Sequence, residues 1–308
     1  MKTYLLCALG TVVALGSSAA QSQSQSKAPA PSVSGTFFAS HDSDDFRESK
    51  QTLGYTNAAG WGLRAGPVRY TSPGWAASGN MLVGTYKRTD DSRSLDANLG
   101  AARVSGIDYL VGGLDYMEKL NPATAVGVSV ERDFVNSVRG IDSGTHFTSL
   151  ALVLDHAFSQ RFNVGVAAGS ALFSNDNNRP ILRTRWNYSL DERYGFNAFL
   201  KTRNYRNTNA YRPEYFSPER LSEVSVGLSA RFEVAQAFVL SASVDAGQQR
   251  IDGASEPIWR GNLGVASRRK DSVQWFVGLE ASNAAGLFSG QTASYRYTSA
   301  TARVSVPF

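Results

Sequence analysis

Basic side chains recur at every second position in two neighbouring segments of this 308-residue chain. Arg183 and Arg185 stand in the first segment, and Lys201 and Arg203 stand in the second. A spacing of two places such residues on one face of a β-strand, where a row of cations can bind anions or pair with acids from other strands. We predict that this face lines a water-filled lumen and that its pore-lining residues are Arg183, Arg185, Lys201, Arg203, Arg231, Asp155, Asp245, Glu280, Tyr109 and Phe199.

The segments that carry these residues have two unlike faces. Segment 223–232 alternates apolar residues such as Val224 with polar residues such as Ser225, and segments 237–249 and 273–282 repeat the pattern. Alternation with a period of two indicates β-strands with one polar and one apolar face. Because an Arg or Lys that faces lipid at mid-membrane costs about 2–4 kcal/mol, the polar face is expected to point inward.

Counting these segments back from the C-terminus gives about fourteen strands, and residues 36–41 and 51–57 add a further hairpin. The predicted fold is an all-β transmembrane antiparallel barrel of about sixteen strands, with fourteen as the alternative. An even number is expected because a bacterial outer-membrane chain starts and finishes on the periplasmic side. Sixteen strands would enclose an aqueous channel rather than a packed interior.

The connections between the segments are predicted to alternate strictly between short turns and long loops. Such sorting is typical of outer-membrane barrels, whose periplasmic turns are tight and whose outer loops are long. The long loops are expected near residues 136–144, 174–179, 206–220, 252–257 and 283–291.

The longest of these loops holds a candidate constriction. One interpretation is that the loop folds into the channel and narrows it. The other is that it forms a turn that starts the next strand, since proline fixes its own φ and holds the preceding residue extended. The residues concerned are Tyr215, Phe216, Ser217, Pro218, Glu219 and Arg220.

The composition excludes several classes of protein. A mean hydropathy of −0.24 excludes a bundle of membrane helices, because each span would need about 20 mostly apolar residues. An aromatic content of 11% excludes a chain that is disordered throughout. The net charge of +5 is mild and no Lys/Arg run supports nucleic-acid binding, so no nucleic-acid partner is predicted.

The N-terminus predicts export. Residues 1–20 combine a basic start at Lys2, an apolar core and small residues before Ala20, which is the pattern of a cleaved signal peptide. Residues 21–34 are polar and repetitive with prolines, and are predicted to form a disordered periplasmic tether. The barrel is then expected over residues 35–308, in the bacterial outer membrane.

The C-terminus carries a predicted assembly signal. Val304 and Val306 are apolar residues at alternate positions before the final aromatic residue, Phe308. Chains that are delivered to the outer-membrane assembly machinery end in this way. The predicted partners are therefore this machinery and the lipid of the outer membrane.

Few residues suggest catalysis or metal binding. His156 falls on the lipid-facing register, as the serine–histidine pair of a lipid-modifying barrel enzyme would require, but it lies next to a short turn, where an amphipathic ring is expected. His41 lies beside the acidic segment 42–45, which lacks the spacing of an EF-hand. The one cysteine, Cys7, lies in the predicted signal peptide. We predict no enzyme activity, no cofactor and no metal site.

Three stretches of sequence resemble one known family. FFASHDSDDFRES, residues 37–49, is similar to the first hairpin of the C-terminal barrels of exopolysaccharide export porins. These outer-membrane proteins export poly-N-acetylglucosamine and cellulose, and a phage-adsorption barrel is related to them. RPEYFSPERLSEVSVGL (212–228) and DAGQQRIDG (245–253) resemble the same family in an aromatic-Ser-Pro pattern before a strand and a Gly-Gln-rich strand end. The resemblance implies a sixteen-stranded barrel that carries a polymer outward.

The chain departs from that family in one respect. Those porins carry periplasmic helical repeats that dock synthase or modifying enzymes, and no repeat of about 34 residues precedes the first strand predicted here. A synthase-linked periplasmic partner would therefore be a separate chain. We predict an outer-membrane pore for passive export of a secreted polysaccharide. The alternatives are a general or solute-selective diffusion porin, a receptor or adhesin scaffold and a lipid-modifying barrel enzyme.

Overall fold

Alternating polar and apolar side chains produce sixteen strands in the computed structural model, all of them in one sheet. The structure describes residues 30–192, 194–234, 237–268, 272–286 and 295–308. The strands are β1 (Ser32–Asp42), β2 (Arg47–Thr56), β3 (Trp61–Ser72), β4 (Trp75–Thr89), β5 (Arg93–Val104), β6 (Ile107–Asn121), β7 (Thr124–Phe134), β8 (His146–Ala157), β9 (Phe162–Phe173), β10 (Asn178–Asp191), β11 (Phe196–Arg206), β12 (Arg220–Val234), β13 (Phe238–Ile251), β14 (Ala254–Ser267), β15 (Gln274–Ser282) and β16 (Tyr297–Pro307).

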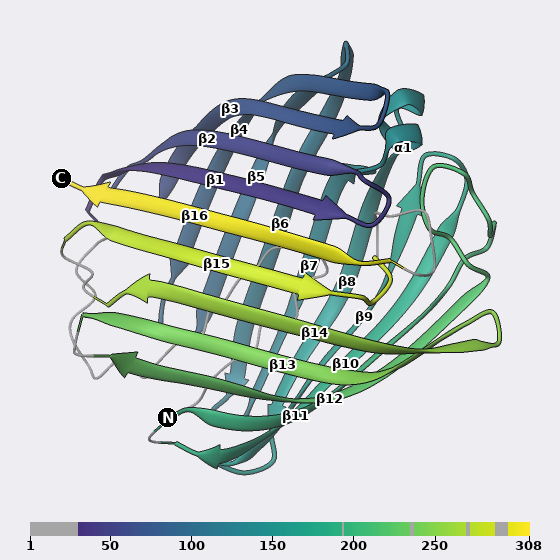
Figure 1. Ribbon diagram of the computed structural model, residues 1–308. Coiled ribbons are helices and arrows are strands. Elements are labelled where there is room, and N and C mark those ends of the chain that lie inside the picture. The colour runs from purple at the N-terminus through teal and green to yellow at the C-terminus, as the bar shows by residue number, and fades with distance from the viewer. Residues whose placement is uncertain (1–29, 193, 235–236, 269–271, 287–294) are drawn as a thin grey trace.

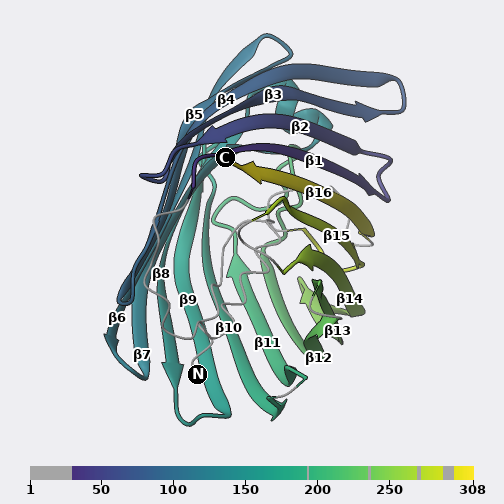
Figure 2. The same cartoon turned by 90° about the vertical axis from the view of Figure 1, so that its left-hand side faces the viewer.

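The sheet closes because the first strand pairs with the last. β1 and β16 run antiparallel and stay in register from the Ser32–Pro307 pair to the Asp42–Tyr297 pair. Every other strand pairs with its neighbours in sequence, which gives an up-and-down barrel (Figures 1 and 2). A closed ladder leaves no strand edge without hydrogen-bond partners, as crossing a bilayer requires. The predicted sixteen-stranded barrel is confirmed, and the fourteen-stranded alternative is wrong because residues 32–56 supply a full hairpin.

The two faces of the barrel wall differ in exposure and polarity. On the outer face, Leu152 is 69% exposed and Val226 is 62% exposed. Their neighbours on the inner face, Ala151 and Ser225, are each 1% exposed. A continuous apolar exterior is unfavourable in water, whereas covering it with acyl chains gains about 25 cal/mol per Å². The exterior is therefore suited to lipid, and the polar register lies inside.

The two ends of the barrel differ in their connections. We call the end that holds the first residue of β1 and the last of β16 the turn end, and the opposite end the loop end. Long connections lie at the loop end, at residues 135–145 and 207–219 and after β15, where residues 283–286 and 295–296 are described and the rest of the predicted loop 283–291 lies outside the described residues. The first contains helix α1 (Val138–Ser143), which lies beside the loop ends of the strands (Figure 1).

Two predicted loops are shorter than expected. Segment 252–257 is reduced to a turn of Asp252 and Gly253, whose φ angles are 48° and 98°, and β14 begins directly after it. Positive φ at both positions defines the tight hairpin turn that Asp-Gly favours. Segment 174–179 is reduced to residues 174–177, because Asn178 and Arg179 already pair with β9. The predicted strict alternation of short turns and long loops is therefore wrong at the loop end.

The predicted N-terminal segments are described only in part. The predicted signal peptide 1–20 and residues 21–29 of the predicted tether lie outside the described residues. β1 begins at Ser32, before the predicted barrel start at residue 35, because its pairing with β16 extends that far. In the described ranges, no helix is long and apolar enough to cross a membrane.

The orientation of the outer face predicts a position-dependent cost for a charge. Leu152→Arg, at the middle of β8, is expected to lower the free energy of unfolding from vesicles by about 2–4 kcal/mol. Leu120→Arg is the matched control, since Leu120 is 62% exposed and lies at the turn end of β6, where the cost falls to about 0–1 kcal/mol. Denaturant titration in phospholipid vesicles measures both values. Equal losses in the two variants would contradict a lipid-facing wall.

Candidate functional site in the barrel interior

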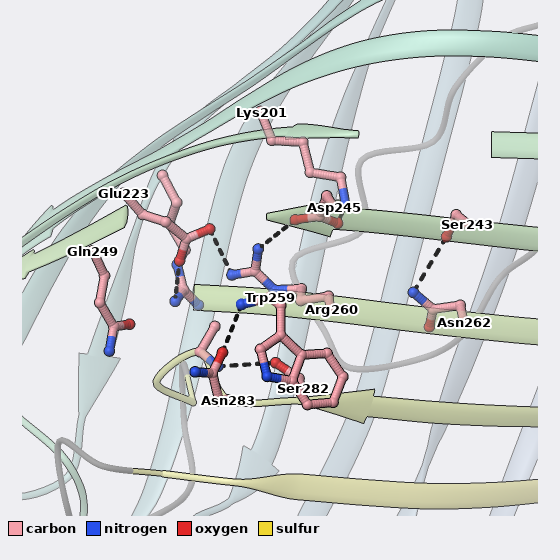
Figure 3. Close-up of polar contacts among 12 residues, drawn as sticks. Lys201, Glu223, Ser243, Asp245, Gln249, Trp259, Arg260, Asn262, Ser282 and Asn283 are labelled. Atoms are coloured by element: carbon pink, nitrogen blue, oxygen red, sulfur yellow. Dashed lines mark hydrogen bonds and ion pairs between the residues drawn. The ribbon is translucent and has the colours of Figure 1, made fainter. Parts of the chain in front are cut away.

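Five charged side chains from β11, β12, β13 and β14 meet on the inner face of the barrel. Figure 3 labels four of them, which are Lys201, Glu223, Asp245 and Arg260. Nζ of Lys201 lies 2.7 Å from Oδ2 of Asp245, whose other carboxylate oxygen lies 3.1 Å from Nη1 of Arg260. Nη2 of Arg260 lies 2.5 Å from Oε1 of Glu223. Oε2 of Glu223 lies 2.6 Å from Nη2 of Arg203. Cations and anions alternate along this chain of contacts, which we call the inner charge network.

The strand register brings the members of the network together. Arg203 is the direct cross-strand partner of Glu223, and Asp245 is the direct partner of Arg260. Opposite charges that face each other across strands stabilise a sheet and help to define its register. The contact between Glu223 and Arg260 is different, because it reaches past β13 to a strand that is not a neighbour.

The acids of the network are more buried than its cations. The side chains of Asp245 and Glu223 are 1% and 3% exposed, whereas those of Lys201, Arg203 and Arg260 are 24%, 12% and 16% exposed. Each carboxylate contacts two cations, as a buried carboxylate requires. The network therefore keeps a net positive charge, which lies on its more exposed side chains.

The connection that follows β15 touches the network. Nη2 of Arg203 donates to the backbone oxygen of Ala285 at 2.8 Å, and the backbone nitrogen of Ala285 donates to Oε1 of Gln249 at 3.0 Å. Gln249 is fully buried, and Figure 3 shows its side chain beside Glu223. Residues 283–286 are thereby held against the inner wall rather than extended away from the loop end.

The cations of β10 extend the basic side of the wall. Arg183 lies directly opposite Arg203 in the register. Arg185 lies opposite Lys201 in the same way. Like charges in direct opposition repel, and the ring of Phe199 reduces this cost. Cζ of Arg185 lies 4.2 Å from the ring centroid of Phe199, and Nζ of Lys201 lies 4.7 Å from it.

A second group of charges, mostly acidic, lies on the inner faces of β2, β6, β7 and β8. Nζ of Lys50 lies 2.5 Å from Oε1 of Glu48. Arg183 on β10 interacts electrostatically with Glu131 on β7, so the basic and acidic groups meet in the interior. The carboxylate oxygens of Asp155 are buried and have no hydrogen-bond partner among the described residues. The acidic members of this group are Glu48, Asp115, Glu131, Asp133 and Asp155.

The loop 207–219 folds from the loop end onto the inner face. The ring of Tyr215 stacks on that of Phe173, with centroids 4.2 Å apart and an interplanar angle of 12°. The guanidinium carbon of Arg179 lies 4.6 Å from the ring centroid of Tyr205 and 5.3 Å from that of Tyr215. Arg179 is fully buried, so this contact is a desolvated cation–π cluster. The loop is anchored inside the barrel.

Hydrogen bonds hold the same loop in place. Nη2 of Arg179 donates to the backbone oxygen of Phe216 at 2.9 Å, and Nε donates to Oδ1 of Asn207 at 2.8 Å. Nδ2 of Asn177 donates to the hydroxyl oxygen of Tyr215 at 2.8 Å. Burial raises the pKa of Tyr215, so its hydroxyl stays protonated and can also donate. Asn177 is 1% exposed, which makes these bonds part of a dry cluster.

The connection 135–145 packs at the loop end against the inner side chains of β3–β7. Ile141 in α1 is fully buried, and its backbone oxygen accepts a hydrogen bond of 3.1 Å from the hydroxyl of Tyr109. The hydroxyl of Ser137, which caps the start of α1, donates to the backbone oxygen of Glu214. The two inward-folded connections are therefore joined to each other over the interior.

Aromatic rings narrow the interior further at this end. The ring of Tyr70 on β3 lies 5.9 Å from that of Phe134 on β7, although three strands separate these strands along the wall. The rings of Phe134 and Tyr109 lie 4.6 Å apart. Contacts between strands that are not neighbours cross the interior. The loop end is thus narrowed by packed aromatic side chains, whereas the middle of the barrel is lined by charged ones.

The remaining predicted residues occupy separate places. Arg231 lies on the inner face of β12 toward the turn end, opposite Ser241. Glu280 on β15 interacts electrostatically with Arg260. The predicted assembly residues lie on the outer face at the turn end. Val304, Val306 and Phe308 are 46%, 44% and 70% exposed.

Two members of the site are absent from the residues predicted to line the pore. Glu223 is predicted only as the start of a strand, yet it shares the polar register with Ser225 and is the acid that joins two arginines. Arg179 is predicted in a loop, although its spacing from Arg183 puts it on the same inner face. The period of two was the available signal in both cases.

The histidines show different surroundings. Nδ1 of His156 lies 3.0 Å from Oγ1 of Thr124, and the ring packs against Phe158. In the described part of the chain, no serine hydroxyl bonds to His156, so the pair that the enzyme alternative requires is not formed there. Nε2 of His41 lies 3.5 Å from Oδ1 of Asp45. The described residues contain no cluster of ligands suited to a metal ion.

Known structures share this architecture, although no protein-family model and no curated protein matches the sequence. The barrel is similar to a structure described as a bacterial polysaccharide outer membrane secretin, with a TM-score of 0.73, 12% identity, and coverage of 92% of this chain and 99% of that one. CdiB from Acinetobacter baumannii gives a TM-score of 0.50, 10% identity, and coverage of 89% and 60%. OpdQ from Pseudomonas aeruginosa gives a TM-score of 0.45 and 10% identity, with coverage of 92% of this chain and 99% of that one. At this level of identity, the likeness to the secretin shows a common fold, that of outer-membrane β-barrels.

The inner charge network predicts that a single Glu→Gln substitution within it strongly destabilises the barrel. Glu223→Gln is expected to lower the free energy of unfolding by about 3–5 kcal/mol, because two partly buried guanidinium groups lose a carboxylate that is itself 3% exposed. The matched control is Glu233→Gln. Glu233 pairs with Arg268 at 2.7 Å, both side chains are at least 40% exposed, and the expected loss is below about 1 kcal/mol. Titration with guanidinium chloride in vesicles measures the free energy of unfolding of both variants. Similar losses in the two variants would contradict a cooperative network.

Proposed function

We propose that the protein is an outer-membrane pore, with the turn end in the periplasm and the loop end outside. The closed barrel with an apolar exterior and a charged interior supports this location. The first residue of β1 and the last residue of β16 both lie at the turn end, which agrees with a chain that inserts from the periplasm. The shared fold with a polysaccharide outer membrane secretin supports the same proposal.

The substrate that we propose is a secreted polysaccharide, pushed outward without an energy source in the pore. The observation that carries this proposal is a charge-lined middle section behind a loop end that is narrowed by anchored connections. In the network, cations and acids offset one another, so the wall offers donors and acceptors for sugar hydroxyls without a strong net field. The resemblance of residues 37–49 and 212–228 to export porins supports the same substrate class.

A diffusion porin is the second candidate function. The excess of cations on β10–β12, which includes Arg183, Arg185 and Arg231, favours selection of small anions. A permanently open pore of this kind would conduct with loop 207–219 in its anchored position, whereas a gated exporter would conduct only when the loop is released. Tyr215 and Arg179, which hold loop 207–219 inside, therefore distinguish the two candidates.

The proposed partners act at the turn end. A separate periplasmic protein linked to the synthase would deliver the polymer to this mouth. The outer-membrane assembly machinery would recognise Val304, Val306 and Phe308, which are exposed on the outer face of the last strand.

Loosening the anchored loop is expected to open the pore. Tyr215→Ala removes a ring stack and a buried hydrogen bond, and should raise the open fraction in planar bilayers about tenfold. Tyr211→Ala is the matched control. Tyr211 belongs to the same loop, is 70% exposed, and makes its side-chain hydrogen bond to Asp252. If the unmodified protein carries a large, constant current and neither variant changes it, loop 207–219 does not close the pore.

Current block by sugars separates the two candidate functions. A β-linked amino-sugar or glucose oligosaccharide added at the turn end should interrupt the current of the Tyr215→Ala pore at concentrations where the monosaccharide has no effect. A chain that spans several residues of the network makes many weak contacts at once, so its residence is longer. Equal effects of the monomer and the oligomer would favour the diffusion porin.

A further inference from the structure

The outer wall carries unpaired cations at the loop end of β11–β13. Arg206 and Arg220 are direct cross-strand partners, and both are exposed. The prediction that Arg220 belongs to the constriction loop is wrong, because Arg220 is the first residue of β12 and lies on the outer face. Arg250 on the next strand is also exposed and lies opposite Ser222. Across the described ranges, none of these three arginines has an acid within ion-pair distance. Like charges in this arrangement repel, so an anion that bridges them would stabilise the wall.

The acids nearest in sequence do not fill this role. Oδ1 of Asp252 accepts the backbone N–H of Arg220 at 2.7 Å. Oδ2 accepts the backbone N–H of Glu219 at 3.2 Å and the hydroxyl of Tyr211 at 3.0 Å. The carboxylate of Asp252 is therefore already engaged by these three donors, and the exposed Glu219 forms no ion pair within the described residues. The guanidinium groups remain available to a ligand.

A groove of about 480 Å³ opens on the wall beside two of these arginines. Residues at even positions of β10, β11 and β12 share the outer face with exposed residues such as Leu182 and Val224, so the groove is open to the lipid side. Its outward residues are apolar on β10 and polar or charged on β11 and β12. The outward residues that line it are Pro180, Leu182, Asn204, Arg206, Arg220 and Ser222.

A second groove, of about 790 Å³, continues along the same strands toward the turn end. It is apolar, and it is hollowed where Ala198 and Ala246 stand among bulkier neighbours such as Trp186 and Leu228. Between the two grooves, Thr184 and Thr202 bond to each other at 2.9 Å, which satisfies their hydroxyls against an apolar environment. A path for an acyl chain thus leads down from the arginines.

We propose that this face binds one phosphorylated lipid of the surrounding leaflet. Arg206, Arg220 and Arg250 hold the headgroup phosphates, and the acyl chains lie in the two grooves. Guanidinium groups bind phosphate oxygens bidentately, and basic residues at a membrane surface attract anionic lipid. Asn204 and Ser222 lie at the same depth and donate to ester or sugar oxygens of the headgroup. This site requires the barrel to lie in a membrane but is independent of what passes through it.

The segregation of charge and apolar surface favours a lipid over a free phosphate ion. An isolated anion would use the arginines and leave the grooves exposed. A lipid covers both, and the area it buries in the grooves adds to the electrostatic attraction. A phosphate group without acyl chains is therefore expected to bind weakly.

Native mass spectrometry of the full mature protein in detergent tests the proposal with three probes. These are diphosphoryl lipid A, the same lipid after enzymatic removal of its phosphates, and inorganic phosphate. The intact lipid should bind, the dephosphorylated lipid should bind at least about tenfold more weakly, and inorganic phosphate should not compete. Equal binding of the two lipids would overturn the proposal, and so would competition by inorganic phosphate at the concentration of the lipid.

Variants locate the site on the wall. The triple variant Arg206→Gln, Arg220→Gln and Arg250→Gln should lose about 100-fold in affinity, since each basic residue near an anionic headgroup contributes about fivefold. The matched control is the triple variant Arg47→Gln, Arg69→Gln and Arg103→Gln, which removes exposed arginines from the loop end of β2, β3 and β5. The control should bind as the unmodified protein does. Equal affinity of both triple variants would overturn the assignment.

A groove-filling variant tests the acyl-chain part separately. Ala246→Trp should weaken binding of the intact lipid about tenfold while the three arginines are unchanged. Heat-modifiable migration on gels shows whether each variant is folded. Unchanged lipid affinity in folded Ala246→Trp would refute the role of the lower groove. Conductance in planar bilayers should be the same for all these variants, so failure of the lipid site is distinguishable from failure of the pore.

Discussion

Closure of the hydrogen-bond ladder between β1 and β16 is the constraint on which the rest of this molecule depends. Lipid offers no partner to a backbone N–H or C=O group, so a sheet in a membrane is stable only when its first and last strands pair. The continuous register from Ser32–Pro307 to Asp42–Tyr297 meets this condition. Once the wall is closed, alternate side chains point to opposite faces, so that one set contacts acyl chains and the other lines the interior.

The interior then has to accommodate many charges at close range. Arg183 opposite Arg203 would be unfavourable in an isolated hairpin, and the acids of β12 and β13 compensate for it from the other side. The result is a middle section with strong local polarity and a small net charge. The aromatic clusters around Arg179 and Phe134 do the opposite at the loop end, where they exclude water and anchor the connections. The charged lining and the packed aromatic clusters thus occupy different heights of the same barrel.

The outer wall is not uniform either. Over most strands it presents Leu, Val and aromatic side chains to lipid, but β10–β13 combine hollows with a group of arginines at the loop end. The same strands carry the basic side of the interior on their other face. The strands β10–β13 therefore carry two separate sets of cations. One set lies on the inner face in the middle of the barrel, and the other lies on the outer face at the loop end. The period of two keeps the sets on opposite faces of the wall.

Most strands, and the faces on which their side chains lie, follow from the sequence alone, because a period of two is a local property of the chain. Lys201, Arg203 and Asp245 were predicted on the polar face for this reason. Which charges meet depends instead on how the closed barrel aligns its strands. The contact of Glu223 with Arg260 depends on the stagger between strands that are not neighbours. The inward fold of loop 207–219 depends on the rings of Phe173 and Tyr205, which lie on other strands and become its support only when the barrel is closed.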